Sequence, residues 1–200
     1  AKLIFVDNNG IGSALVENLR AKGETVYTVR YASSFEQLSE YSFAINNEDM
    51  ADYMQTLETV LSNTASKGII LDKIIYCWSL DVANNCTDID QSQRLVYESP
   101  LFLTQAISRV KLKTARLYFI TQCAQVVNKN QGNISILQSP LWGFSRAVSL
   151  EDSDLGCVSI DLDSGNDLNI DQLSKELNAI DFEDQVSFRE NQRLVRRIVR

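Results

Sequence analysis

The sequence contains no histidine, so the commonest general base and the commonest metal ligand of proteins are both absent. Its apolar runs fall far short of the roughly 18 residues that a membrane-spanning helix needs, and no signal-peptide pattern opens it. The net charge of −7 argues against a nucleic-acid surface. We therefore expect a cytoplasmic protein without a metal site that binds neither nucleic acid nor membranes.

Cysteine is scarce as well, and the cysteines are widely spaced. The four are Cys77, Cys86, Cys123 and Cys157, and three of them lie in apolar, strand-like runs. This pattern predicts buried free thiols in a reducing compartment rather than disulfide bonds.

The first thirty residues contain the most informative pattern. A strand-like run at residues 3–6 meets a polar turn, and a helix-period segment follows it to residue 22. Such a strand, turn and helix open the dinucleotide-binding folds, in which the turn holds a pyrophosphate at the helix N-terminus. Here the turn contains Asp7, Gly10 and Gly12 but lacks the first of the usual three glycines. Because a carboxylate beside a diphosphate repels it, we predict a degenerate turn that binds no cofactor.

Strands and helices alternate along the rest of the chain. We expect helices at residues 48–64, 91–110, 139–150 and 169–179, and strands at 25–31, 73–78, 116–121, 156–161, 185–189 and 192–199. Residues 35–46 look irregular, with a short strand at 41–45, and Pro100 predicts a kink or break in its helix. These elements indicate one α/β domain over residues 1–200. Its fold is a truncated Rossmann-like one, with a doubly wound, mainly parallel sheet, helices on both faces and a C-terminal strand pair.

Six stretches, which together extend over nearly the whole chain, resemble one family. They are LIFVDNNGIG at 3–12, YCWSLD at 76–81, LYFIT at 117–121, QSPLWGFSR at 138–146, VSIDLD at 158–163 and the segment 183–199. In this order they resemble the N-terminal structural subdomain of the ketoreductases of modular polyketide synthases. These ketoreductases are two-part relatives of the short-chain dehydrogenases. The resemblance implies that only a second, catalytic half carries out the reaction.

The residues required for short-chain dehydrogenase chemistry can be sought directly. Those enzymes place a lysine four residues after a tyrosine, and none of the seven tyrosines here has a lysine at that spacing. The helix that should carry the pair holds Trp142 and Arg146 instead, which predicts either a cation–π pair or docking site, or a packed indole beside a solvated guanidinium. The serine of such enzymes would fall near Thr121 or Gln122.

Other candidate sites are weaker. Arg30, at the end of the second strand, is the best remaining argument for a nucleotide, because a basic residue there can pair with a 2′-phosphate. Asp81 is expected to cap a helix, line a cleft or face solvent. The carboxylates of Glu151, Asp152 and Asp154 could suggest a cation site but are expected to be solvated. Those of Asp161, Asp163, Asp167 and Asp171 resemble a calcium loop only loosely, because Gln172 stands where the closing glutamate is needed.

We therefore expect a non-catalytic structural subdomain that is part of a larger polyketide synthase chain and is not an enzyme alone. The resemblance implies that NADPH binds the catalytic partner subdomain, which reduces a β-ketoacyl group on an acyl carrier protein. Neighbouring synthase domains are the other expected partners. One alternative is a pseudo-ketoreductase scaffold beside a dehydratase or methyltransferase in a non-reducing module. The others are a free-standing NADP-dependent oxidoreductase and a small-molecule sensor with a pocket beyond Val6, Trp78 and Thr121.

Overall fold

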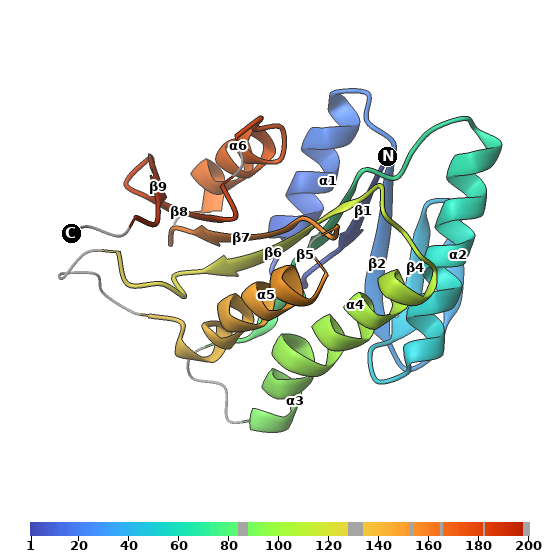
Figure 1. Cartoon of the computed structure of the whole chain (residues 1–200), viewed down its shortest axis with the longest axis horizontal. Coiled ribbons are helices and arrows are strands. Elements are labelled where there is room, and N and C mark those ends of the chain that lie inside the picture. The colour runs from blue at the N-terminus through green and yellow to red at the C-terminus, as the bar shows by residue number, and fades with distance from the viewer. Residues whose placement is uncertain (84–87, 128–133, 153, 165, 182, 198–200) are drawn as a thin grey trace.

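The computed structural model describes all residues except 84–87, 128–133, 153, 165, 182 and 198–200 (Figure 1). Cys86, one of the four predicted free thiols, lies outside the described residues. No helix of the described part is long and apolar enough to cross a membrane.

The centre of the fold is one nine-stranded sheet. Its strands are β1 (Lys2–Phe5), β2 (Val26–Ala32), β3 (Glu36–Ser39), β4 (Ser42–Asn46), β5 (Lys73–Tyr76), β6 (Arg116–Gln122), β7 (Cys157–Leu162), β8 (Gln185–Arg189) and β9 (Gln192–Val195). The order across the sheet is β3-β4-β2-β1-β5-β6-β7-β8-β9. All pairs are parallel except the hairpins at the two edges, β3–β4 and β8–β9. The predicted Rossmann-like α/β fold with a C-terminal strand pair is confirmed.

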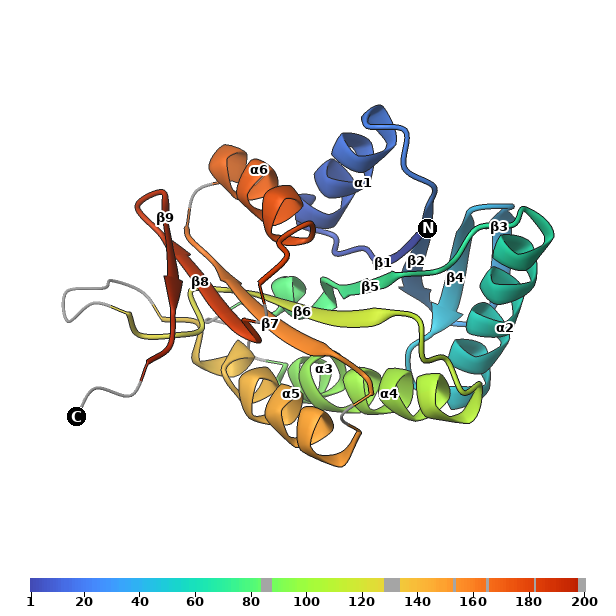
Figure 2. The same cartoon turned by 45° about the horizontal axis from the view of Figure 1, so that its top comes forward.

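Helices cover both faces of the sheet, as predicted (Figure 2). They are α1 (Ile11–Ala21), α2 (Met50–Ser66), α3 (Ile89–Gln93), α4 (Ser99–Arg109), α5 (Pro140–Glu151) and α6 (Asn166–Glu176), with short 3₁₀ turns at Trp78–Asp81 and Ile136–Gln138. Helices α1 and α6 lie side by side on one face, and α2, α4 and α5 lie on the other.

Each face of the sheet has its own core because neighbouring strand residues point to opposite faces. In β1, Leu3 and Phe5 join the core under α2 and α4, whereas Ile4 joins the core under α1. The first core is rich in aromatic rings, and those of Phe5 and Trp78 meet edge to face with centroids 5.0 Å apart. The second core is mostly aliphatic. Strands buried on both faces explain the continuous apolar runs of the sequence.

Two regions differ from the sequence-based expectation. Residues 35–46, predicted to be largely irregular, form the β3–β4 hairpin. Strand β3 has the sequence EQLS and all four of its residues are exposed, so no alternation of apolar and polar residues marks it. The predicted last strand, 192–199, ends at Val195. The tight turn before it is confirmed, because Glu190 and Asn191 both have positive φ angles, as a two-residue hairpin of type I′ requires.

The interruption expected at Pro100 is a π-helical turn at Arg94–Glu98, between α3 and α4. Proline has no backbone N–H, so the α-helical bond to the carbonyl four residues earlier is missing. The N–H of the preceding residue, Ser99, bonds to the carbonyl of Arg94, five residues earlier, as in a π-helix. The chain therefore widens by one residue at this point and then continues as α4.

Replacing Leu15 with alanine tests the packing of α1. Leu15 is 0% exposed, and a Leu→Ala change at such a position costs about 2–5 kcal/mol through lost burial and the cavity it leaves. We expect Leu15→Ala to lower the free energy of unfolding by this amount in a urea titration. The matched change Leu150→Ala, at a position 86% exposed on α5, should alter it by less than about 0.5 kcal/mol. Equal effects of the two changes would contradict this packing.

Candidate functional site

The turn between β1 and α1 is closed by its own carboxylate. Asp7 is 1% exposed, and its Oδ1 accepts the N–H of Gly12 at 2.6 Å while its Oδ2 accepts that of Ile11 at 3.2 Å. These N–H groups belong to the first turn of α1, which has no partner for them within the helix. A phosphate bound at a helix N-terminus would use the same groups.

Two glycines make this arrangement possible. Gly10 precedes the helix with a φ of +99°, in the left-handed region that favours glycine. A Cβ atom on Gly12 would lie 2.8 Å from Asp7 Oδ1, so a larger residue there would displace the carboxylate. The predicted residues of the turn thus lie together, and Asp7 occupies the donors rather than only repelling an anion nearby.

A second carboxylate, Asp81, closes the next part of the same edge. Its oxygens accept the backbone N–H of Asn8 at 2.8 and 3.0 Å and the hydroxyl of Tyr31 at 3.1 Å. The amide of Asn8 also donates to that hydroxyl, and the amide of Asn9 donates to the Leu80 carbonyl at 2.7 Å. Asp81 is half-buried, and its carboxylate joins the ends of β1, β2 and β5.

Burial raises the pKa values of two groups in this cluster, Asp81 and Tyr31. It raises the pKa of the Asp81 carboxyl above its usual range, although the hydrogen bonds from Asn8 and Tyr31 oppose the shift. Burial, together with the charge of Asp81, raises the pKa of Tyr31 to about 12. The phenol therefore stays protonated near neutral pH and donates a hydrogen bond to Asp81.

Arg30 lies at the surface over the start of α1. Its Nη2 is 3.4 Å from the hydroxyl oxygen of Ser13, and its side chain is exposed. Its predicted pairing with a 2′-phosphate stays a prediction. The residues that would mark a sensor pocket, Val6, Trp78 and Thr121, are buried in the core, and that hypothesis is likewise untested.

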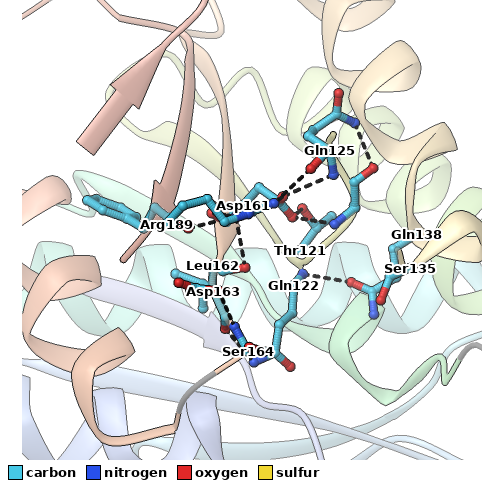
Figure 3. Close-up of polar contacts among 12 residues, drawn as sticks. Thr121, Gln122, Gln125, Ser135, Gln138, Asp161, Leu162, Asp163, Ser164 and Arg189 are labelled. Carbon is cyan, nitrogen blue, oxygen red and sulfur yellow. Dashed lines mark hydrogen bonds and ion pairs between the residues drawn. The ribbon is translucent and has the colours of Figure 1, made fainter. Parts of the chain in front are cut away.

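A third carboxylate, Asp161 of β7, organises the far end of the edge (Figure 3). It is 0% exposed and forms an ion pair with Arg189, at the end of β8, which is 5% exposed. It also accepts the hydroxyl of Thr121 at 2.6 Å and the backbone N–H groups of Ala124 at 2.8 Å and Gln125 at 3.0 Å. These partners satisfy the hydrogen-bonding capacity of a carboxylate that is removed from water.

Arg189 distributes its donors over several backbone carbonyls. It donates to Phe188 at 2.6 Å, to Gln125 at 2.8 Å and to Leu162 at 3.3 Å. The ion pair therefore ties the segment after β6 and the β8–β9 hairpin to the end of β7. The sequence offered one weak signal for this pair, namely a charged residue at the end of each of two apolar strands.

Thr121 and Gln122, where the serine of a short-chain dehydrogenase was expected, both make hydrogen bonds within the fold. The Thr121 hydroxyl donates to Asp161 and accepts the indole N–H of Trp142 at 3.0 Å. At the next position, the backbone N–H of Gln122 donates to the side chain of Gln138 at 2.9 Å. Trp142 is buried, and Arg146 donates to the Gln185 side chain at 3.0 Å. Trp142 and Arg146 do not form the cation–π pair considered above.

Several carboxylates of the suggested cation sites are engaged in protein contacts. Asp161 pairs with Arg189, and the side chain of Asp167 lies outside the described residues. Burial tends to raise the pKa of Asp163, but hydrogen bonds from the N–H groups of Glu190 and Ser164 outweigh it and lower the pKa. Asp154 pairs with Lys113 at 2.6 Å. Within the described part of the chain, no group of three or more potential ligands is placed to hold a metal ion.

The described cysteines are unpaired, and their surroundings make them poor nucleophiles. Cys77 and Cys157 are buried and Cys123 is partly buried. Burial raises the pKa of Cys77 well above its usual range and that of Cys157 to about 11. Thiols that remain protonated in this way are inert as nucleophiles.

Comparison with known proteins supports this architecture. A family model described as "Beta-ketoacyl synthase-like, N-terminal" matches residues 1–179. No curated protein matches the chain.

Solved structures share the fold. One is an adenylation, ketoreductase and pseudo-Asub multidomain structure of a keto acid-selecting NRPS module, with a TM-score of 0.82 and 23% identity over 96% of this chain. An N-terminal ketoreductase from the macrolactin assembly line gives 0.71 and 15% over 100%, and a C2-type ketoreductase from a modular polyketide synthase gives 0.71 and 22% over 97%. The chain spans only 16%, 40% and 38% of these three proteins, respectively.

Two of the arginine–carboxylate pairs near the C-terminus, one buried and one exposed, provide a test of the buried network. Removing one partner of a buried ion pair costs about 3–5 kcal/mol, since the other charge is left uncompensated. We expect Arg189→Met to lower the free energy of unfolding by this amount in a urea titration. Arg197→Met, which breaks an exposed pair with Glu183, should cause little measurable change. A similar loss in both variants would contradict a special role for Asp161 and Arg189.

Proposed function

We propose, since this chain belongs to the beta-ketoacyl synthase-like N-terminal family, that it is a non-catalytic structural subdomain supporting an NADPH-dependent ketoreductase of a polyketide synthase module. Residues 1–200 would form one such subdomain within a larger chain. The fold shared with ketoreductases supports the proposal. So does the absence from the sequence of any tyrosine with a lysine four residues later.

The observation that carries the proposal is the position of Asp7. A dinucleotide would need the N–H groups of Ile11 and Gly12, and the buried carboxylate already accepts both. A diphosphate would have to displace this carboxylate or lie beside it. Bringing two like charges together in a site removed from water costs several kcal/mol of binding free energy. NADPH would accordingly bind the catalytic partner, and this chain would hold no cofactor.

The second support is that the polar groups at the carboxyl edge are already used. Thr121 donates to one partner and accepts from another, and Tyr31 donates to Asp81. A general acid for ketone reduction must be free to give its proton to the developing alkoxide. These hydroxyls instead hold neighbouring strands together, which fits a supporting domain.

The proposed role is mechanical. The network of Asp161 and Arg189 fixes the β8–β9 hairpin at the end of the sheet, and this hairpin with the residues after it would form the junction with the catalytic subdomain. A stable interface of this kind buries on the order of 800 Å² per partner. The partner would reduce a β-ketoacyl group carried by an acyl carrier protein.

Titration of the 200-residue chain with NADPH is the direct test. A ligand present at 100 times its dissociation constant adds about 2.7 kcal/mol to stability, which a melting curve resolves easily. We expect no change in melting temperature up to millimolar NADPH. In the same assay, a catalytic ketoreductase subdomain should melt at a higher temperature when this chain is added. A shift by NADPH alone, with reduction of a β-ketoester, would favour the free-standing oxidoreductase.

Removing the Asp7 carboxylate tests the reason for the absence of binding. Asp7→Ala should lower the free energy of unfolding by about 1 kcal/mol, as the loss of a capping carboxylate does. It also frees the N–H groups of Ile11 and Gly12, so inorganic pyrophosphate should raise the melting temperature of the variant but not of the native chain.

A matched control is Asp49→Ala, which removes the carboxylate that caps α2. This change should destabilise the chain to a similar degree without creating pyrophosphate binding. If both variants, or neither, respond to pyrophosphate, the phosphate position is not what Asp7 occupies.

A further inference from the structure

A groove of about 350 Å³ lies between α5, the β8–β9 hairpin and the segment after β6. Its walls include Trp142 and Arg146 of α5, Gln185 and Ser187 of β8, Leu194 of β9, and Val126. Gln185 and Ser187 point to the α5 side of the sheet, whereas Val186 and Phe188 pack on the α6 side. The groove therefore lies on the α5 side of the sheet's last two strands.

The charge lining the groove is of one sign. Arg146, Arg196 and Arg197 line it, and no carboxylate does, although the chain as a whole has a net charge of −7. Arg197 is balanced by Glu183, at 2.9 Å from its Nη1. Within the part of the chain that the structure describes, no carboxylate lies within ion-pair distance of Arg146 or Arg196. Two uncompensated guanidinium groups thus flank the groove.

The groove also offers apolar surface and a free strand edge. Val126 is 64% exposed at its rim. Strand β9 is the last of the sheet, and its outer edge is not paired with any other described strand. Such an edge presents backbone donors and acceptors to an added extended segment.

The walls of the groove are held in place before anything binds. Arg189 donates to the Gln125 carbonyl at 2.8 Å, and Arg146 donates to Gln185 across the junction of α5 and β8. An occupant would therefore not have to order these elements, which reduces the cost of binding.

We infer that this groove binds an extended acidic segment of a neighbouring domain. Carboxylates of the segment would pair with Arg146 and Arg196, and an apolar side chain between them would lie against Val126 and Leu194. The inference rests on the proposed function, because the neighbouring domain is the partner that the chain would support. It adds the chemistry by which that partner is recognised.

A peptide probe tests the groove directly. The chain has two tryptophans, so Trp78→Phe leaves Trp142, in the wall of the groove, as the sole fluorescent reporter. We expect the peptide acetyl-Glu-Val-Glu-Val-Glu-amide to shift its emission saturably. The double change Arg146→Gln and Arg196→Gln should weaken binding about tenfold, as expected for the loss of two partly exposed ion pairs. Salt at about 1 M, where the screening length is near 3 Å, should weaken binding similarly.

A charge-matched control is the double change Arg109→Gln and Lys111→Gln, at the opposite end of the sheet. It should leave the affinity unchanged, and the peptide with lysine in place of glutamate should not bind. If Trp78→Phe does not fold, calorimetry on the native chain gives the same comparison. No saturable binding at millimolar peptide, or equal binding by the Arg146 and Arg196 variant, would overturn the inference. The assay contains neither NADPH nor a reductase, so its failure would leave the proposed function standing.

Discussion

The structure depends on how the carboxyl edge of the parallel sheet satisfies its polar groups. At this edge strands end, helices begin, and backbone N–H groups point outward without partners. In dinucleotide-binding folds a ligand can accept them. Here Asp7, Asp81 and Asp161 do so, one after β1, one after β5 and one within β7. At these positions the chain supplies the acceptors from its own side chains.

This arrangement explains how the architecture can persist without a ligand. Each carboxylate links segments that are distant in sequence, since Asp81 bonds to Asn8 and Asp161 to Arg189. The contacts hold the strand ends in register while the two cores hold the faces. A cofactor contributes to stability only when it is present. Side-chain carboxylates contribute at all times, which is consistent with the supporting role that we propose.

The elements of the sheet could be predicted from sequence, but the contacts at its edge could not. Apolar strands buried on both faces and amphipathic helices leave a local periodic signal, as in residues 3–22. Strand β3 leaves none, because all its side chains face solvent. The role of Asp81 depends on a residue 73 positions away, and that of Asp161 on one 28 positions away. Only Asp7 could be placed in advance, because its partners follow within five residues.

The charged groups at the carboxyl edge differ from those beside the groove in how far they are buried and paired. The three edge carboxylates are partly or fully buried and matched by donors, so little of their charge remains for a partner to recognise. Arg146 and Arg196 lie at the other extreme, beside a groove at the end of the sheet, where no described carboxylate is within ion-pair distance of them. Because buried, satisfied charge stabilises a fold and unsatisfied surface charge selects partners, our proposal assigns recognition to the C-terminal hairpin rather than to the carboxyl edge of the parallel strands.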